Sequence, residues 1–319
     1  MQRTSSDEPW PELPYTAWQD TCATLQLWTQ IVGKVRLKQT PWLNHSWQVA
    51  LYVTPRGLTT SSIPYGADAF ELSFDFVDHV LRAQTSQGGA GSDGSVRLEA
   101  KSVADFYREL MQLLEQLHVP VKIDELPNEL PEPIRFSQDR VHASYDPEYA
   151  RRFGRVLLQA DRVFKRFRSG FLGKASPVHF FWGSFDLAVT RFSGRSAPRH
   201  PGGVPHLPDL VAQEAYSHEV SSAGFWPGGN GMDASFYSYS YPEPPGYREA
   251  RVRPADAKFE PKLGEFVLPY ASVRAAKDPE ATLLEFLHSS YEAAAVAAKW
   301  DRPALECALG DPGVVRSLD

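Results

Sequence analysis

The sequence predicts an α+β protein made of two similar halves, each a mainly antiparallel sheet flanked by helices. Segments rich in β-branched and aromatic residues recur in both halves and are typical of strands. Amphipathic stretches lie before and after them and are typical of helices. A connector at 120–137 that is rich in proline and acidic residues separates the two sets. We therefore expect an N-terminal half, 1–137, and a C-terminal half, 138–319.

The N-terminal half is expected to begin with a helix at 16–35, where apolar side chains recur at helical spacing. Its further elements are strands at 47–54 and 70–77, a hairpin loop at 86–95, a helix at 103–117 and a short strand at the start of the connector. Ser102 is a good N-cap for the second helix.

The C-terminal half is expected to begin with a helix at 148–170, which has one apolar side and many basic residues. Strands are expected at 184–192, 216–223, 234–241 and 264–269. A last helix begins after Asp278, which can cap it, and Pro279, which suits the first helical position.

The two halves share an order of features that suggests an internal duplication. In each, a helix ending in "VGK" or "LGK" is followed by a proline, a histidine, a tryptophan, "LYVT" or "LAVT", and an arginine. The offset between matched residues varies, so chance similarity remains an alternative. If the halves are duplicates, a cleft between them is the expected place for a ligand.

Composition limits the function classes. The formal net charge of -6 argues against a general polyanion binder, which leaves nucleic-acid binding through the basic helix at 148–170 as a minor alternative. Two cysteines are too few for a disulfide scaffold. No apolar run follows the N-terminal charges, and no uncharged stretch is long enough to span a bilayer. We expect a cytoplasmic protein without a membrane segment; the sequence does not indicate its oligomeric state.

The stretch from His179 to Arg195 holds the first candidate site residues. Side chains alternate along a strand, so Asp186 lies on the face opposite the apolar residues Leu187 and Val189. It therefore points either to solvent or into a polar pocket. A bend at Trp182 would bring His179 near Asp186.

A second polar strand adds His218 and Glu219. Together with His179 and Asp186 they could act as general acids and bases. Alternatively, His179, His218 and Asp186 could ligate a divalent metal, iron or zinc, as in a metal-dependent hydrolase or oxygenase. Both ideas require the two histidines to lie within roughly 12 Å of each other, given metal–ligand bonds of about 2 Å.

Cations and aromatic rings accompany these strands. Lys174, Arg191 and Arg195 would bind the carboxylate or phosphate of a small anionic molecule, and Trp182 and Trp226 flank the polar segments. A row of tyrosines in the strand at 234–241 is either a pocket wall or a core layer.

Several of these stretches resemble a bacterial family of unknown function, number 5996: "NHSWQVALYVTPRGLTT", "SPVHFFWGSFDLAVTRFSGR" and "EAYSHEVSSAGFWPGG". The resemblance covers nearly the whole chain and implies a single conjoined unit, with no assigned activity. The family's first motif is expected to carry a bulky aromatic residue and a histidine where this chain has Ser46 and Gln48. That departure argues against a metal site built on the first half.

The leading functional expectation is a cytosolic enzyme that acts on a small anionic metabolite in a cleft between the halves. His179, Asp186, His218 and Glu219 would carry its acid–base or metal chemistry. The alternative is a non-catalytic module that binds a small ligand or a partner protein through its tyrosine and tryptophan surfaces.

Overall fold

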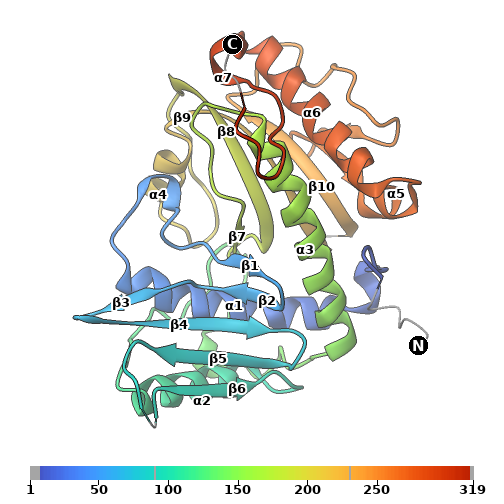
Figure 1. The fold of residues 1–319 in the computed structure, drawn as a ribbon. Coiled ribbons are helices and arrows are strands. Elements are labelled where there is room, and N and C mark those ends of the chain that lie inside the picture. The colour runs from blue at the N-terminus through green and yellow to red at the C-terminus, as the bar shows by residue number, and fades with distance from the viewer. Residues whose placement is uncertain (1–7, 90, 230, 317–319) are drawn as a thin grey trace.

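The computed structural model describes residues 8–89, 91–229 and 231–316. Within these residues the protein has two six-stranded antiparallel sheets and seven α-helices, which confirms the predicted α+β class. One sheet lies in each half of the chain, and helix α3 (Pro147–Ser169) runs past both of them (Figure 1).

The N-terminal sheet has the order β1-β2-β4-β5-β6, and β3 pairs with β4. Its strands are β1 (Tyr52–Thr54), β2 (Gly57–Thr59), β3 (Ile63–Tyr65), β4 (Asp68–Asp75), β5 (Val80–Thr85) and β6 (Asp93–Arg97). Burial alternates along β4, where Phe70, Leu72 and Phe74 are buried. This sheet therefore buries one face.

Helices α1 (Gln19–Gln39) and α2 (Val103–Gln116) pack together, and Trp28 of α1 stacks on Phe106 of α2. The Ser102 hydroxyl accepts a hydrogen bond from the backbone NH of Asp105, which confirms the predicted N-cap.

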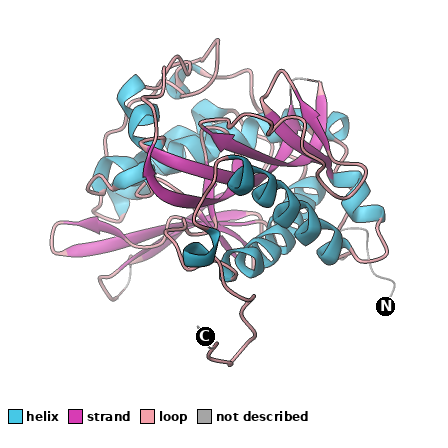
Figure 2. Cartoon of the chain, turned by 90° about the horizontal axis from the view of Figure 1, so that it is seen from above, coloured by secondary structure: helices cyan, strands magenta, loops and turns pink. Residues whose placement is uncertain are grey.

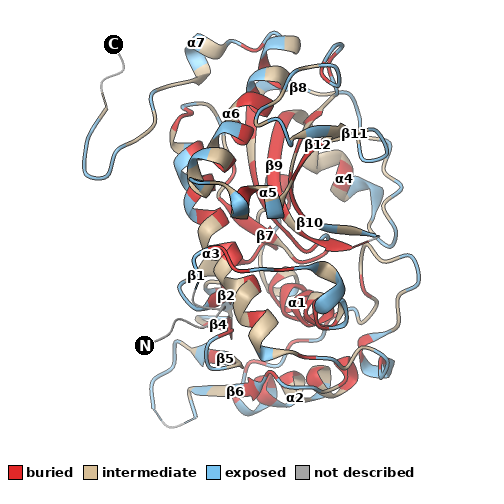
Figure 3. Ribbon diagram, turned by 90° about the vertical axis from the view of Figure 1, so that its right-hand side faces the viewer, coloured by how far each residue is buried: buried red, intermediate tan, exposed pale blue. Residues whose placement is uncertain are grey.

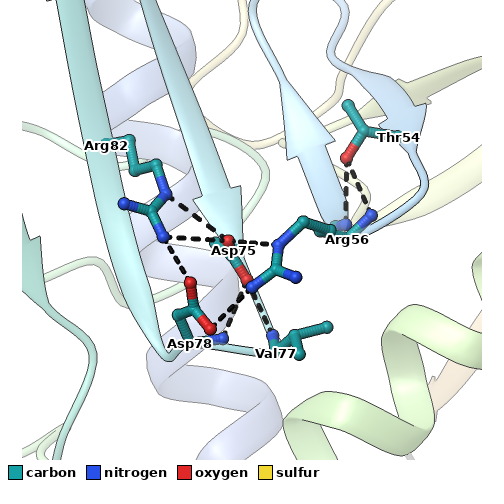
Figure 4. A network of polar contacts seen from close by, with 7 residues as sticks. Thr54, Arg56, Asp75, Val77, Asp78 and Arg82 are labelled. Atoms are coloured by element: carbon teal, nitrogen blue, oxygen red, sulfur yellow. Dashed lines mark hydrogen bonds and ion pairs between the residues drawn. The ribbon is translucent and has the colours of Figure 1, made fainter.

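A network of charged groups closes the turn between β4 and β5 (Figure 4). The buried Asp75 carboxylate accepts a hydrogen bond of 2.6 Å from Arg56 and forms an ion pair of 3.4 Å with Arg82. The backbone NH groups of Val77 and Asp78 each donate to it at 2.9 Å. Burial raises the Asp75 pKa, but the bonds from Arg56 and these NH groups outweigh burial and leave the pKa lowered.

The C-terminal sheet has the order β11-β12-β10-β9-β8-β7. Its strands are β7 (His179–Phe181), β8 (Asp186–Ser196), β9 (His218–Gly229), β10 (Met232–Tyr241), β11 (Lys258–Glu260) and β12 (Glu265–Pro269). Strand β9 is buried along most of its length (Figure 3), which indicates cover on both of its faces. In β10 buried residues alternate with half-buried ones from Phe236 to Tyr241.

Helices pack against this sheet, and a view from above shows the helices and strands in contrasting colours (Figure 2). The helices that pack against the sheet are α3, α5 (Tyr270–Ala275) and α6 (Pro279–Ala297); the two further helices of the half are α4 (Asp209–Ala215) and α7 (Arg302–Leu305). Phe164 of α3 packs against Phe236 of β10. Asp278 caps α6, as the sequence predicts, by accepting from the NH of Ala281.

The halves contact each other at several points, of which three fix the start of the C-terminal sheet. Leu51 and Phe180 exchange two backbone hydrogen bonds of 2.9 and 2.7 Å. The indole NH of Trp182 donates to the carbonyl oxygen of Val49 at 2.8 Å. The Trp182 ring lies directly on α1 at Gly33, where an added Cβ would come within 2.2 Å of it.

The structure does not show the predicted duplication. Both sheets have six strands, but "LYVT" spans the isolated bridge at Leu51 and the short strand β1, whereas "LAVT" lies inside the long strand β8. His45 lies in a 3₁₀ turn, Asn44–Ser46, while His179 begins a strand. The matched residues therefore occupy different structural positions.

Two strand predictions differ from the structure. The predicted strand at 47–54 is reduced to β1, because residues 44–49 form turns, and the connector at 120–137 contains no strand. The connector's prolines cannot donate ladder hydrogen bonds. In the part of the chain that the structure describes, no helix combines the length and the apolar character needed to cross a bilayer.

Candidate functional site

A cavity of about 420 Å³ lies on the face of the C-terminal sheet that the helices leave open. We call it the acidic cavity. The sheet supplies one wall: His179, Phe181, Asp186, Ala188, Thr190, Phe192, Val220, Ser222, Trp226, Met232, Ser235, Tyr237, Tyr239, Glu265 and Val267. Segments that fold over the sheet supply the rest: His45, Trp47, Glu129, Ser184, Ala215, Tyr216 and Leu263.

Asp186 is held at this wall by two hydroxyl groups. The Ser184 hydroxyl donates to one carboxylate oxygen at 2.5 Å, and the Tyr237 hydroxyl donates to the other. Tyr237 lies on β10, two strands away, and reaches Asp186 because Gly224 on the intervening strand has no side chain. A Cβ at Gly224 would lie 2.3 Å from the Tyr237 hydroxyl oxygen. The missing side chain at Gly224 thus leaves the space through which Tyr237 contacts Asp186.

Two more carboxyl groups face the same cavity. Glu129 arrives from the connector, and its side chain lies against Gly183, where a Cβ would come within 1.9 Å of its carboxylate. Glu265 is the first residue of β12. Among the described residues, neither carboxyl group has a hydrogen-bond or ion-pair partner.

Burial sets the charge state of these groups. It raises the pKa of Glu129 and of Glu265 to about 7, and the nearby Asp186 carboxylate adds to both shifts. Burial also raises the pKa of Asp186, while the bonds from Ser184 and Tyr237 oppose that shift. The cavity therefore holds two carboxyl groups, those of Glu129 and Glu265, whose pKa values lie near neutral pH.

Tyrosines surround the carboxyl groups. The hydroxyl groups of Tyr216 and Tyr239 are 2.9 Å apart, and the rings of Tyr237 and Tyr239 stack. Burial raises the pKa of Tyr216 to about 12, so its hydroxyl group stays protonated at neutral pH. The tyrosine row that the sequence left undecided thus includes two residues, Tyr237 and Tyr239, that form a cavity wall.

The other end of the cavity carries a histidine paired with a lysine. His45 Nδ1 lies 2.9 Å from the carbonyl oxygen of Ala215, and its Nε2 lies 2.6 Å from Lys174 Nζ. A carbonyl oxygen can only accept, so Nδ1 carries the hydrogen and Nε2 accepts from the lysine. Burial lowers the pKa of His45, and Lys174 lowers it further.

The structure brings three of the predicted site residues to the cavity: His179, Asp186 and Trp226. His179 is 1% exposed, and burial followed by the charge of Arg36 lowers its pKa to about 3. His179 is therefore neutral in the folded protein. Lys174 borders the cavity through His45.

The remaining predicted residues lie elsewhere. Arg191 is on the helix face of the sheet, where its guanidinium group lies 3.6 Å from the ring centre of Phe167. Arg195 pairs with Glu219 at 2.6 Å. Trp182 is buried between the halves. None of these four lines the cavity.

The two predicted histidines are far apart. His179 is opposite Ala188 on β8, and His218 is opposite Ser196, eight residues further along the same strand. At about 3.3 Å per residue that separation is roughly 25 Å, twice the limit of roughly 12 Å set above. The predicted metal ligands His179, His218 and Asp186 therefore do not meet, and no other group of three or more His, Cys, Asp or Glu residues in the described chain could hold a metal ion.

Sequence reasoning missed Glu129, Glu265 and Tyr216. Glu129 stands in the acidic connector, which reads as a solvated linker, and Glu265 begins a short strand. The one local signal is the backbone of Glu129, which has a positive φ of 63°; such a conformation in a residue other than glycine often marks a functional site. A φ value is not readable from sequence.

Comparison with known proteins supplies a family and no activity. Searches among curated proteins and among solved structures gave no match. A family model described as a family of unknown function, DUF5996, matches residues 10–307, which cover both sheets and every residue of the acidic cavity. The chain therefore belongs to the DUF5996 family.

Proposed function

We propose that the protein is an enzyme that binds a small polar molecule in the acidic cavity and uses the carboxyl groups there as its general acid and base. One observation carries the proposal. Glu129, Asp186 and Glu265 come from three separate segments and face a single cavity, and two of them have no partner among the described residues.

Acid–base catalysis is effective when the catalytic group titrates near the working pH. The pKa values of about 7 for Glu129 and Glu265 meet that condition. Asp186, oriented by Ser184 and Tyr237, is the best placed proton acceptor, and a protonated glutamic acid is the donor. The reaction class that this set supports is one that needs both, such as hydrolysis or isomerisation.

The cavity volume supports a small-molecule substrate. A volume of about 420 Å³ lies in the usual range for ligand pockets, about 300–1,000 Å³. The cavity lies on the C-terminal sheet, and the N-terminal half contributes His45, Trp47 and Glu129 to its wall, so the predicted inter-half cleft remains part of the proposal. The predicted anion-binding arginines, Arg191 and Arg195, lie away from the cavity. Of the three predicted anion-binding cations, Lys174 alone borders the cavity, through its contact with His45.

A non-catalytic small-ligand module is the second candidate, and the aromatic lining favours it. Trp47, Phe181, Trp226 and the tyrosines could bind a ligand by stacking alone. The enzyme and the binding module differ in whether they convert a bound molecule. In the enzyme, Asp186→Asn would abolish that conversion, whereas a binding module converts nothing with or without the substitution.

The test begins with a substrate search, in which the purified protein is incubated with defined metabolite mixtures and followed by NMR. For a converted compound we expect a bell-shaped dependence of kcat/KM on pH with one limb near 7. We expect Asp186→Asn to lower kcat about 100-fold or more. A substrate that the variant converts at the full rate would refute the acid–base proposal.

We also propose a cytoplasmic location. Cys22 and Cys307 are both free, as is usual in a reducing compartment. Fractionation of the source cells with an antibody would test this: recovery in the membrane or periplasmic fraction would contradict it.

A further inference from the structure

We infer that the molecule bound in the acidic cavity carries a positive charge, as a protonated amine or a quaternary ammonium group, and that this charge lies between Asp186, Glu129 and Glu265. The inference rests on the proposed function, because it specifies the ligand class of the same cavity. It contradicts the expectation of an anionic ligand.

The charged side chains that line the cavity are mostly acidic. Three carboxyl groups face it, and the lining residues include no lysine and no arginine. Of the two lining histidines, His179 is fully buried beside Arg36, which opposes its protonation, and His45 already accepts a hydrogen bond from Lys174. A buried carboxylate without a counter-ion is costly. A cationic ligand would supply the counter-ion that the chain does not.

The cavity lining also holds a buried polar atom without a partner. His179 is 1% exposed and lines the cavity, and its Nδ1 has no hydrogen-bond partner among the described residues. Buried polar atoms are usually paired in folded proteins, and in the described part of the chain Nδ1 of His179 is the one side-chain nitrogen or oxygen atom in the cavity lining that is buried and unpaired. His179 shares the sheet face with Asp186, since its strand partner Ala188 is two residues along β8.

Aromatic rings form much of the cavity wall around the carboxyl groups. Phe181 is the strand partner of Asp186, and Trp226 and the stacked pair of Tyr237 and Tyr239 complete the lining around the carboxyl groups. Ring faces carry partial negative charge and attract cations, most strongly quaternary ammonium groups. The carboxylates and the ring faces of the cavity therefore both favour a ligand with a positive charge.

The first experiment compares ligands that share a body and differ in charge. Tyramine, tyrosol and 3-(4-hydroxyphenyl)propanoate present an ammonium, a hydroxyl and a carboxylate group on a similar phenol. Choline and 3,3-dimethylbutan-1-ol form a second pair. By calorimetry at pH 8 we expect each cation to bind about tenfold or more tightly than its neutral counterpart. Tightest binding by the propanoate, or equal binding within each set, would overturn the inference.

Matched variants locate the effect. Glu129→Gln should reduce the preference for tyramine over tyrosol several-fold. Glu285→Gln makes the same chemical change on α6, in a residue paired with Arg253 at 3.1 Å, and should leave the preference unchanged. Equal loss in both variants would show that the preference comes from net charge alone and would overturn the site assignment.

The second experiment needs no ligand. Phe181 is replaced in turn by Lys, Gln and Glu, which places a positive, neutral or negative side chain opposite Asp186. We expect the Lys variant to melt at least about 4 °C above the Glu variant at pH 8, with Gln between them. The reverse order would overturn the inference.

Neither experiment measures turnover. Cation binding without any catalysis would therefore leave this inference standing while removing the proposed enzyme function, and turnover of a neutral or anionic substrate would do the opposite.

Discussion

Asp75 in the N-terminal sheet and Asp186 in the C-terminal sheet are both buried carboxyl groups on antiparallel strands, yet their surroundings differ. Asp75 meets Arg56, Arg82 and two backbone NH groups, and its pKa is lowered. Asp186 meets two hydroxyl groups, lies near Glu129 and Glu265, and has a raised pKa. The Asp75 carboxylate, which is paired with cations and NH groups, stabilises a turn. A set of buried carboxyl groups without a cation, as in the acidic cavity, is typical of a ligand-binding site.

The largest expected loss of stability follows from removing the paired carboxylate of Asp75. Asp75→Ala leaves two arginines and two NH groups without their shared acceptor, and we expect a loss of about 2–3 kcal/mol in the free energy of unfolding. This range is below the usual value for a buried pair because Arg56 and Arg82 are nearly half exposed. Urea unfolding measures the loss. The exposed Asp78→Ala should cost less than about 1 kcal/mol, and equal losses would contradict the distinction.

A smaller loss is expected from closing the opening beside Asp186. In Gly224→Ala the new methyl group would lie 2.3 Å from the Tyr237 hydroxyl oxygen and 2.5 Å from the Leu187 carbonyl oxygen. The ring must move, which breaks its bond to Asp186 and costs about 2 kcal/mol.

Gly88→Ala is the matched control, because a Cβ there has no atom within 4 Å. Thermal unfolding compares the two variants. If Gly224→Ala were as stable as Gly88→Ala, Tyr237 would not be held through this opening.

The two regions should also respond to pH in opposite directions. Glu129 and Glu265 have folded pKa values of about 7 against an ordinary value of 4.5. Between these values the unfolded chain loses protons that the folded protein keeps, so stability falls as pH rises from about 4.5 to about 7. The lowered pKa of Asp75 gives the reverse: its contribution is present above about pH 4 and is lost as pH falls further.

Allowing for partial solvation, the fall between pH 5 and 8 should be about 1–2 kcal/mol. The double variant Glu129→Gln and Glu265→Gln should remove most of it and should be the more stable protein at pH 8, with ligand binding impaired. Unfolding curves across this pH range provide the measurement. A double variant that keeps the full wild-type slope would show that other groups cause it.

The sequence by itself determined the local structure. The alternation of side chains placed Asp186 opposite Leu187 and Val189, and the caps at Ser102 and Asp278 marked two helix starts, as the structure confirms. The same alternation put Arg191 with the apolar residues, so its burial against Phe167 was readable from position, although its charge suggested an anion site. These features depend on spacing within one strand or helix.

Only the tertiary structure decided which carboxyl groups share a site. Glu129 shares the cavity with Asp186 because the connector folds over the sheet at Gly183. Tyr237 contacts Asp186 across Gly224, and Glu265 lines the same cavity because β12 lies beside β10. The separation of His179 from His218 was likewise set by strand register. Register and strand order depend on contacts between segments far apart in the chain, and burial, which sets the pKa values, exists only after those segments have packed.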